Sequence, residues 1–260
     1  MKKLLLILLF AFSAHSYGDE FIELPSPESG MFASSAPTRA MFWFNPDTKG
    51  TIISLPGGDG SFNLTRPRSR PVRGFGLVTT ALLDPNSTSG KWNVAFLDSH
   101  VSLGLQHYPS ARFTDAHLNR VASLIRYIKE KTKKPVWVWG HSNGTITAFN
   151  IYTHLAKTNE QHLIDGIIAS GARDVIKLPD TVNVPVQFIH HQYDACNDTP
   201  YSTAQRNYEK LKTVSTSRIE FSTITSPTTV TNGHPCFTGT HMFDGMYVEL
   251  AQAIDSFVNK

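Results

Sequence analysis

The sequence predicts an α/β fold, and three observations favour it. Short apolar, β-prone segments alternate along the chain with segments whose apolar residues recur at helical spacing. One strand passes directly into a helix through the pattern Gly-x-Ser-x-Gly at residues 140–144. After its N-terminal apolar segment the chain has about 240 residues, an ordinary size for one α/β unit with a large core. We therefore expect residues 19–260 to form a single domain.

The first 18 residues have the layout of a secretory signal peptide. Lys2 and Lys3 precede an unbroken apolar run over residues 4–12, and small residues follow it. This run is shorter than the roughly 20 residues that a transmembrane helix needs, and no later stretch is long or apolar enough to span a bilayer. We expect cleavage near Ser16 or Gly18, a secreted or periplasmic protein and no stable membrane insertion. An uncleaved anchor is the alternative.

The composition is that of a globular protein without a nucleic-acid partner. The chain has 40% apolar and 17% charged residues and a formal net charge of +3. Loss of the two leader lysines changes this charge from +3 to +1, because residues 1–18 contain no acid. A near-neutral mature protein gives no support for nucleic-acid binding. The sequence does not indicate an oligomeric state.

Strands and helices are predicted from the spacing of apolar residues. Leu118, Val121, Ile125 and Ile128, for example, form one face of a helix. Before residue 135 the expected elements are an arm or short edge strand within 19–40, strands at 41–44, 51–55 and 92–97, and helices at 74–83 and 114–130. After it they are strands at 136–139, 163–170, 184–190 and 218–224, and helices from Thr145, after Pro200 and over 247–258.

The turn between the strand at 136–139 and the following helix carries Ser142. A serine on so sharp a turn needs neighbours with almost no side chain, and Gly140 and Gly144 meet that need. The serine hydroxyl would then lie at the carboxyl edge of the sheet. The backbone N–H of Asn143 would point to the place where an oxyanion forms.

In this context the pattern resembles the nucleophile elbow of the α/β-hydrolase fold, and the chain resembles secreted esterases and dienelactone hydrolases with that fold. The resemblance implies a mostly parallel central sheet with helices on both faces and Ser142 as the nucleophile. Many relatives insert a lid domain between the strands expected here at 163–170 and 184–190. Because only about 13 residues intervene, we expect no large lid domain and an open pocket.

A glycine-rich loop follows the strand at 51–55. The sequence Leu55-Pro56-Gly57-Gly58 resembles the loop that supplies a second oxyanion N–H in this fold, with Pro56 where many relatives have histidine. We assign that N–H to Gly58. A plain surface turn is the alternative.

The resemblance implies a catalytic acid shortly after the strand at 184–190. In this fold the chain order is serine, then acid, then histidine. Asp194 is the predicted acid and Asp198 the alternative. His190 and His191 are adjacent on a strand and would point to opposite faces, so we expect no metal site, and no cofactor is implied.

The chain order also selects the base. After the expected signal peptide, four histidines precede or lie within the serine turn and are excluded: His100, His107, His117 and His141. His241 is the predicted base because a final helix follows it almost at once, although Met242 stands where relatives have glycine. His234, in a Gly-His sequence, is the alternative.

Cys196 and Cys236 are the only cysteines in the chain. In an oxidising compartment they are expected to form a disulfide. Such a bond would join the loop of Asp194 to the loop of His241, and plain stabilisation is an equally compatible role.

These features predict a serine hydrolase that cleaves a small-molecule or polymeric ester, or a related acyl bond, through an acyl-enzyme. Acyl transfer or peptidase activity by the same residues is the first alternative, and a binding protein on an inert hydrolase scaffold is the second. The segment from Arg66 to Arg73 carries four arginines and no acid. It either borders the pocket and favours an anionic substrate or is a solvated loop.

Overall fold

The computed structural model describes residues 18–27, 37–60, 64, 75–84, 86, 90–99, 109–230 and 232–260. Most of the expected signal peptide, the segment from Arg66 to Arg73, and both His100 and His107 lie outside the described residues.

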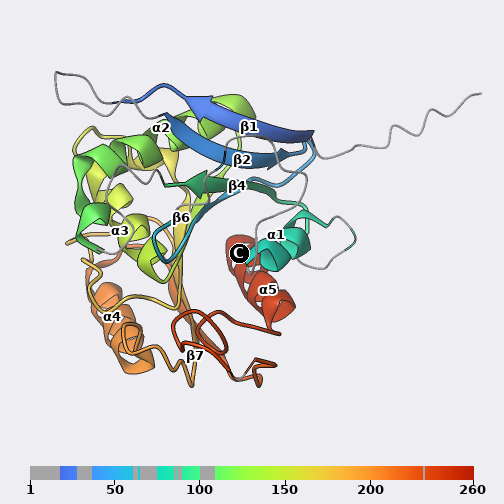
Figure 1. Cartoon of the computed structure of the whole chain (residues 1–260). Coiled ribbons are helices and arrows are strands. Elements are labelled where there is room, and N and C mark those ends of the chain that lie inside the picture. The colour runs from blue at the N-terminus through green and yellow to red at the C-terminus, as the bar shows by residue number, and fades with distance from the viewer. Residues whose placement is uncertain are drawn as a thin grey trace, which may run out of the picture.

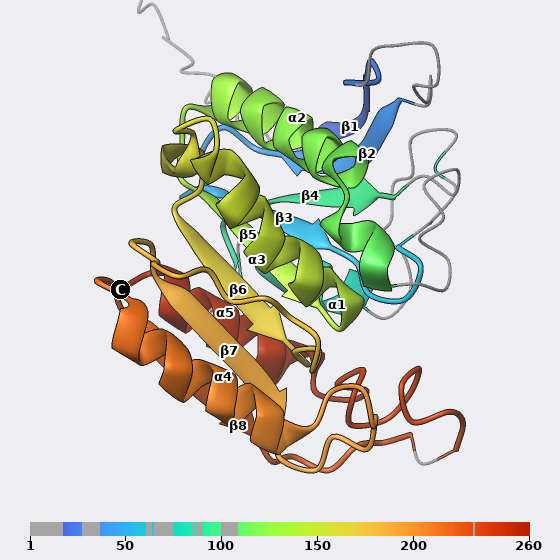
Figure 2. The same cartoon turned by 90° about the vertical axis from the view of Figure 1, so that its left-hand side faces the viewer.

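In the described part of the chain, eight strands form one sheet in the order β1-β2-β4-β3-β5-β6-β7-β8 (Figure 1, Figure 2). The strands are β1 (Gly18–Leu24), β2 (Thr38–Phe44), β3 (Thr51–Leu55), β4 (Asn93–Asp98), β5 (Val136–His141), β6 (Gly166–Ser170), β7 (Val186–His191) and β8 (Ile219–Ile224). Strand β2 runs antiparallel to its neighbours β1 and β4, and the remaining pairs are parallel. The carboxyl ends of the parallel strands therefore meet at one edge of the sheet.

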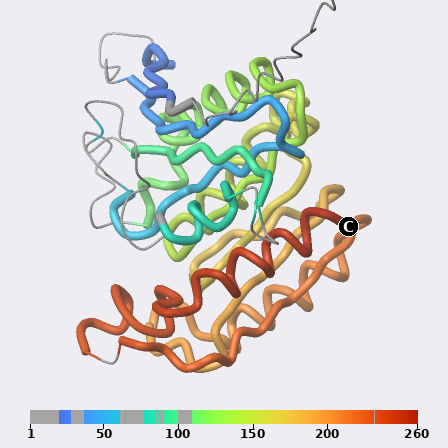
Figure 3. The backbone as a smooth tube through the Cα atoms, turned by 90° about the vertical axis from the view of Figure 1, so that its right-hand side faces the viewer, coloured from blue at the N-terminus to red at the C-terminus, as the bar shows by residue number. Residues whose placement is uncertain are grey.

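Helices cover both faces of this sheet, as predicted. They are α1 (Phe75–Leu83), α2 (Asp115–Thr132), α3 (Asn143–Ala156), α4 (Tyr201–Val214) and α5 (Tyr247–Val258), with short 3₁₀ helices η2 (Pro109–Phe113) and η3 (Gln161–Leu163). Helices α2, α3 and α4 pack on one face, and α1 and α5 pack together on the other (Figure 1, Figure 3).

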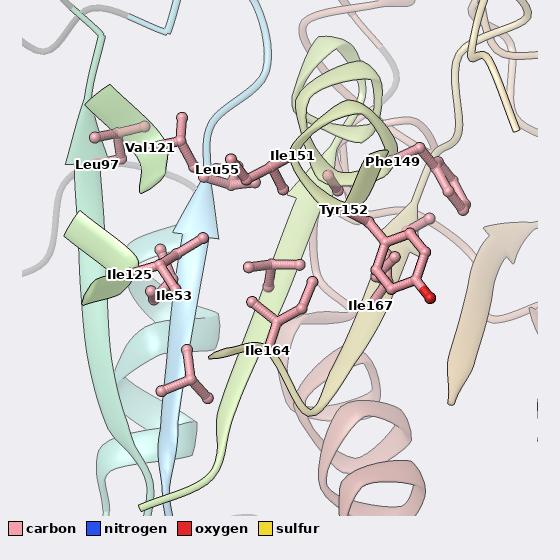
Figure 4. Packing of buried hydrophobic residues seen from close by; sticks show 14 of the residues in the cluster. Ile53, Leu55, Leu97, Val121, Ile125, Phe149, Ile151, Tyr152, Ile164 and Ile167 are labelled. Carbon is pink, nitrogen blue, oxygen red and sulfur yellow. The ribbon is translucent and has the colours of Figure 1, made fainter. Parts of the chain in front are cut away.

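Strand β5 separates the two cores. Val136 and Val138 pack toward α2 and α3, whereas Trp137 and Trp139 pack toward α5. Each of these side chains is buried, so each contributes roughly 1.5–3 kcal/mol to folding. Figure 4 shows the first core, where side chains of the central strands meet those of α2 and α3.

Several element boundaries differ from the prediction by one to three residues, among them those of β6 and α3. Strand β6 begins at Gly166 and not at residue 163, because residues 161–163 form a 3₁₀ turn. Helix α3 begins at Asn143 and not at Thr145, so Ser142 immediately precedes its first residue.

The connection between β6 and β7 spans residues 171–185 and contains no helix, so it holds no lid domain. None of the described helices combines the length and the apolar character that crossing a bilayer requires.

Candidate active site

Ser142 lies on a strained turn between β5 and α3. Its φ is 51° and its ψ is −123°, a conformation that costs a non-glycine residue about 1–3 kcal/mol. A Cβ on Gly140 would collide with the backbone of Gly144, and a Cβ on Gly144 would collide with the carbonyl of Leu55. Both positions therefore require glycine. The Ser142 N–H donates to Ser170 O at 3.0 Å, which fixes the turn at the carboxyl edge of the sheet.

Asp194 and His241 form a buried hydrogen-bonded pair at the same edge. Asp194 follows β7, and His241 lies in the loop between β8 and α5. His241 Nδ1 and Asp194 Oδ2 are 3.0 Å apart, and both side chains are fully buried. Among the described residues, His241 Nε2 makes no hydrogen bond. The ring therefore has one nitrogen on the carboxylate and the other available for a proton.

Three further groups bind the Asp194 carboxylate. The Cys196 N–H donates to Oδ1 at 2.9 Å, the Thr199 hydroxyl donates to Oδ2 at 2.9 Å, and His190 Nε2 lies 3.2 Å from Oδ2. Burial alone would raise the pKa of Asp194. The hydrogen bonds from His190 and His241 outweigh burial and lower that pKa, so the group is a carboxylate at neutral pH.

The imidazole of His241 lies beside the serine turn. Its ring centroid is 4.9 Å from that of His141, the residue before Ser142. A Cβ added to Gly171 would lie 3.0 Å from His141 Cε1 and 3.2 Å from His241 Cε1. Among the described residues no hydrogen bond joins Ser142 Oγ to His241. Burial lowers the pKa of His141 well below its usual range, so His141 is neutral.

The glycine loop after β3 packs against the same turn. A Cβ added to Gly57 would lie 3.0 Å from Ser142 Cβ. Gly58 has a φ of 56°, in the left-handed region that favours glycine. Gly58 O accepts hydrogen bonds from Asn143 Nδ2 at 2.9 Å and from Arg112 Nη2 at 3.2 Å. The side chain of Asn143 therefore binds the loop, a contact that the sequence did not indicate.

Solved structures with this architecture cover nearly the whole chain. A dienelactone hydrolase from Anabaena variabilis aligns with a TM-score of 0.64 and 13% identity over 94% of this chain and 98% of its own. An α/β serine hydrolase without lid from Xanthomonas campestris aligns with a TM-score of 0.57 and 12% identity over 93% of this chain and 94% of its own. An esterase from Pyrococcus furiosus aligns with a TM-score of 0.58 and 14% identity over 94% of this chain and 92% of its own.

The chain has the α/β-hydrolase fold. This fold is the one that the sequence predicted. No family model matches the sequence, and no curated protein matches it either.

Within the α/β-hydrolase fold, the two alternative residues have partners outside the Asp194–His241 pair. His234 is exposed, and its Nδ1 accepts a hydrogen bond from the Cys236 N–H at 3.2 Å. Asp198 Oδ2 lies 3.6 Å from Arg173 Nη1. Neither residue is hydrogen-bonded to His241 or Asp194 in the described part of the chain.

Cys196 and Cys236 form a disulfide, as expected. Their sulfurs lie close to an Asp198 oxygen, but sulfurs bonded to each other are not thiolate ligands for a metal. His190 Nε2 is hydrogen-bonded to the carbonyl oxygen of Thr199 beside α4, whereas His191 Nε2 is hydrogen-bonded to the carbonyl oxygen of Ser226. The two rings lie on opposite faces of the sheet.

Sequence reasoning missed His190 and Thr199 as partners of Asp194. His190 is four residues before the acid at the carboxyl end of β7, and Thr199 is five residues after it. At this point the sequence indicated only a helix after Pro200. The available signal was that both polar residues lie within five positions of the predicted acid, in the turn that follows the strand.

Proposed function

We propose that the protein is a serine hydrolase that cleaves esters or related acyl bonds with Ser142, His241 and Asp194. One observation carries the proposal. The strained strand-to-helix turn that carries a serine lies beside an imidazole that is hydrogen-bonded to a buried carboxylate. The neighbours with the same fold are esterases and hydrolases, which supports this chemistry.

In the proposed reaction, Ser142 Oγ attacks the acyl carbon while His241 Nε2 takes its proton. Asp194 holds the ring through Nδ1 and balances the charge of the imidazolium. The carbonyl oxygen becomes an oxyanion, which the N–H groups of Asn143 and Gly58 stabilise by about 3–4 kcal/mol per donor. His241 then protonates the leaving alcohol. Water, activated by the same imidazole, releases the acid and restores Ser142.

The absence of a Ser142–His241 hydrogen bond in the described structure is compatible with this scheme. Catalytic hydrogen bonds are often long in free enzymes and tighten only when substrate binds. Ser142 is half-buried and Gly58 is exposed, so an acyl group can reach both from solvent.

Replacement of the nucleophile tests the proposal. Ser142→Ala should abolish hydrolysis of a p-nitrophenyl ester series from acetate to palmitate, and it should abolish labelling by a fluorophosphonate. Ser202→Ala, at an exposed position on α4, should leave both unchanged. The chain-length preference would define the acyl pocket, and p-nitroanilides and an added alcohol acceptor would reveal peptidase or acyl-transfer activity by the same serine.

A folded wild-type protein that neither hydrolyses these esters nor reacts with the fluorophosphonate would instead be a binding protein on an inert scaffold.

We also propose that the protein acts in the periplasm or outside the cell, after removal of residues 1–18. The disulfide supports this location, because such bonds persist in oxidising compartments. The N-terminal sequence of the exported protein would show whether cleavage occurs near Ser16 or Gly18.

A further inference from the structure

Arg112 is a buried cation next to the glycine loop. It lies in η2, the short 3₁₀ helix before α2, and only 1% of its surface is exposed. Its Nη2 donates to Gly58 O at 3.2 Å, and its Nη1 donates to Thr147 Oγ1 on α3 at 3.1 Å. A Cβ added to Gly60 would lie 2.9 Å from the same Nη2, so the guanidinium contacts this loop at two points.

The neighbours of Arg112 keep the guanidinium in place. Thr147 Oγ1 is also 2.9 Å from His117 Nε2, so the hydroxyl can accept from Arg112 and donate to a neutral His117. Burial lowers the pKa of Arg112 to about 10, with Asp59 acting against this shift, and the group stays protonated at neutral pH. A buried guanidinium is costly to desolvate. Its use to link the Gly58 carbonyl to the Thr147 hydroxyl on α3 therefore indicates a role for the geometry of that carbonyl.

Backbone hydrogen bonds act on Gly57 and Gly60, at the two ends of this loop. Three of the four residues from Gly57 to Gly60 are glycines, and Gly58 and Gly60 have φ values of 56° and 74°. Glycines give a loop many accessible conformations. The Gly60 N–H donates to Gly57 O at 3.0 Å and closes the turn, and Gly60 O accepts a hydrogen bond from the Ser99 N–H at 2.9 Å. The Gly58–Asp59 peptide, which carries Gly58 O, is held by side chains.

We propose that Arg112 is a positioning residue: it fixes the Gly58–Asp59 peptide through Gly58 O and so limits rotation of the adjoining Gly57–Gly58 peptide, whose N–H is the expected oxyanion donor. This proposal rests on the serine-hydrolase function proposed above. Without the guanidinium, rotation of the loop peptides lowers the fraction of molecules whose oxyanion donors are aligned, and the rate falls with that fraction.

Asn143 is the second donor to the same oxygen. Its Nδ2 binds Gly58 O at 2.9 Å, and its Oδ1 accepts a hydrogen bond from Arg173 Nη1. Gly58 O is thus bound by one arginine directly and linked to a second arginine through Asn143. Since Asn143 also follows the nucleophile, the two expected oxyanion donors belong to one hydrogen-bonded unit.

Kinetics of Arg112 variants test the proposal. Arg112→Met should lower kcat for p-nitrophenyl acetate by about 10- to 100-fold and change KM by less than about threefold, because loop alignment affects the transition state more than the bound ester. Arg112→Lys, which retains a cation and one donor, should be intermediate. The inhibition constant of a boronic acid that forms a tetrahedral adduct with Ser142 should rise in parallel with the loss of kcat/KM.

Arg126→Met is the matched control. Arg126 is a surface arginine on α2 that pairs with Glu160, and its loss should leave kcat and boronate affinity within about twofold of wild type. Circular dichroism would show that each variant is folded at the assay temperature. A folded Arg112→Met with wild-type kcat and boronate affinity would overturn the proposal.

A second measurement decides the case in which Arg112→Met does not fold. Arg112→Lys and Asn143→Ala each weaken one donor to Gly58 O, so their combined effect on kcat/KM should differ from the product of the single effects by at least about threefold. A simple product would overturn the role of Arg112. Failure of the wild-type protein to hydrolyse esters or to react with a fluorophosphonate would overturn the proposed function instead, which keeps the two failures distinguishable.

Discussion

Asp194 lies between two imidazole rings, and the partners of each ring distinguish their roles. His190 Nε2 faces two acceptors, Asp194 Oδ2 and the carbonyl oxygen of Thr199, so this nitrogen carries a proton. His190 is therefore suited to hold the carboxylate. His241 binds the same oxygen through Nδ1, which leaves Nε2 for proton transfer. The proposed acid and base are thus assigned by hydrogen-bond direction as well as by chain order.

Alanine substitution of the two histidines after β8 tests this assignment. His241→Ala should lower kcat for a p-nitrophenyl ester by more than about 10³-fold, because the serine loses its base. His234→Ala should keep kcat within about twofold, since this exposed ring is bonded to the neighbouring Cys236 N–H. A larger loss for His234→Ala than for His241→Ala would contradict the assignment.

Some of the candidate site residues could be predicted from the sequence and others could not. Ser142, Asp194 and His241 stand at loop positions after strands, where a sequence pattern and chain order identify candidates. Arg112 gave no such signal, because it comes from a 3₁₀ turn before α2 and meets Gly58 only through the tertiary packing of η2 on α3. Long-range side-chain contacts of this kind leave no periodic pattern in the chain.

At the scale of elements, two links in addition to the hydrogen bonds of His241 join the turn after β7 to the loop before α5. One is the disulfide between Cys196 and Cys236, and the other is a hydrogen bond of 2.9 Å from Thr240 Oγ1 to the carbonyl oxygen of Tyr193. Cys196 also donates its N–H to Asp194. The covalent link is therefore attached to the group that orients the proposed base.

Removal of the disulfide should affect activity and stability. For a sequence separation of 40 residues, replacing both cysteines by serine should lower the free energy of unfolding by roughly 3–4 kcal/mol. Because the Asp194–His241 distance is then less restrained, kcat should fall under conditions in which circular dichroism shows a folded protein. Denaturant unfolding and ester hydrolysis, with and without reductant, measure the two effects.

Equal activity of the reduced and oxidised proteins, with free thiols confirmed by titration, would limit the disulfide to a stabilising role.

Element boundaries followed the sequence where apolar spacing was unambiguous. The bounds of β3 and α5 agree with the prediction. The early start predicted for β6 was wrong because Leu163 is an apolar residue of a 3₁₀ turn that packs on the core. A short apolar run does not distinguish such a turn from the first residues of a strand.

At the scale of the whole molecule, alternation of elements predicted an α/β protein with helices on both faces, and the order of the eight described strands came only from the structure. Strand β2 pairs with β4 and not with its sequence neighbour β3, which no local pattern specifies. The need for glycine at positions 140 and 144 could be predicted, because the sharp turn at Ser142 leaves no room for a side chain at either position.

Buried histidines make the stability of the fold depend on pH. His117 is 1% exposed, and burial, with the charges of Arg112 and Arg120, lowers its pKa to about 3. In the unfolded chain a histidine takes up a proton below a pH of about 6.5, whereas folded His117 does so only near the lowered value. Between these two pH values the unfolded state binds more protons, so stability falls as the pH falls. The lowered pKa of His141 acts in the same direction.

His117→Gln separates this contribution from the rest of the titration. From pH 6.5 to pH 4.5, His117 should cost the wild-type protein on the order of 2–3 kcal/mol of unfolding free energy, a large part of the 5–15 kcal/mol typical of a domain. Glutamine keeps a polar group near Thr147 but does not titrate, so the variant should lose less stability over the same range. Urea unfolding at the two pH values measures the difference, and an equal loss in both proteins would show that His117 is protonated in the folded state.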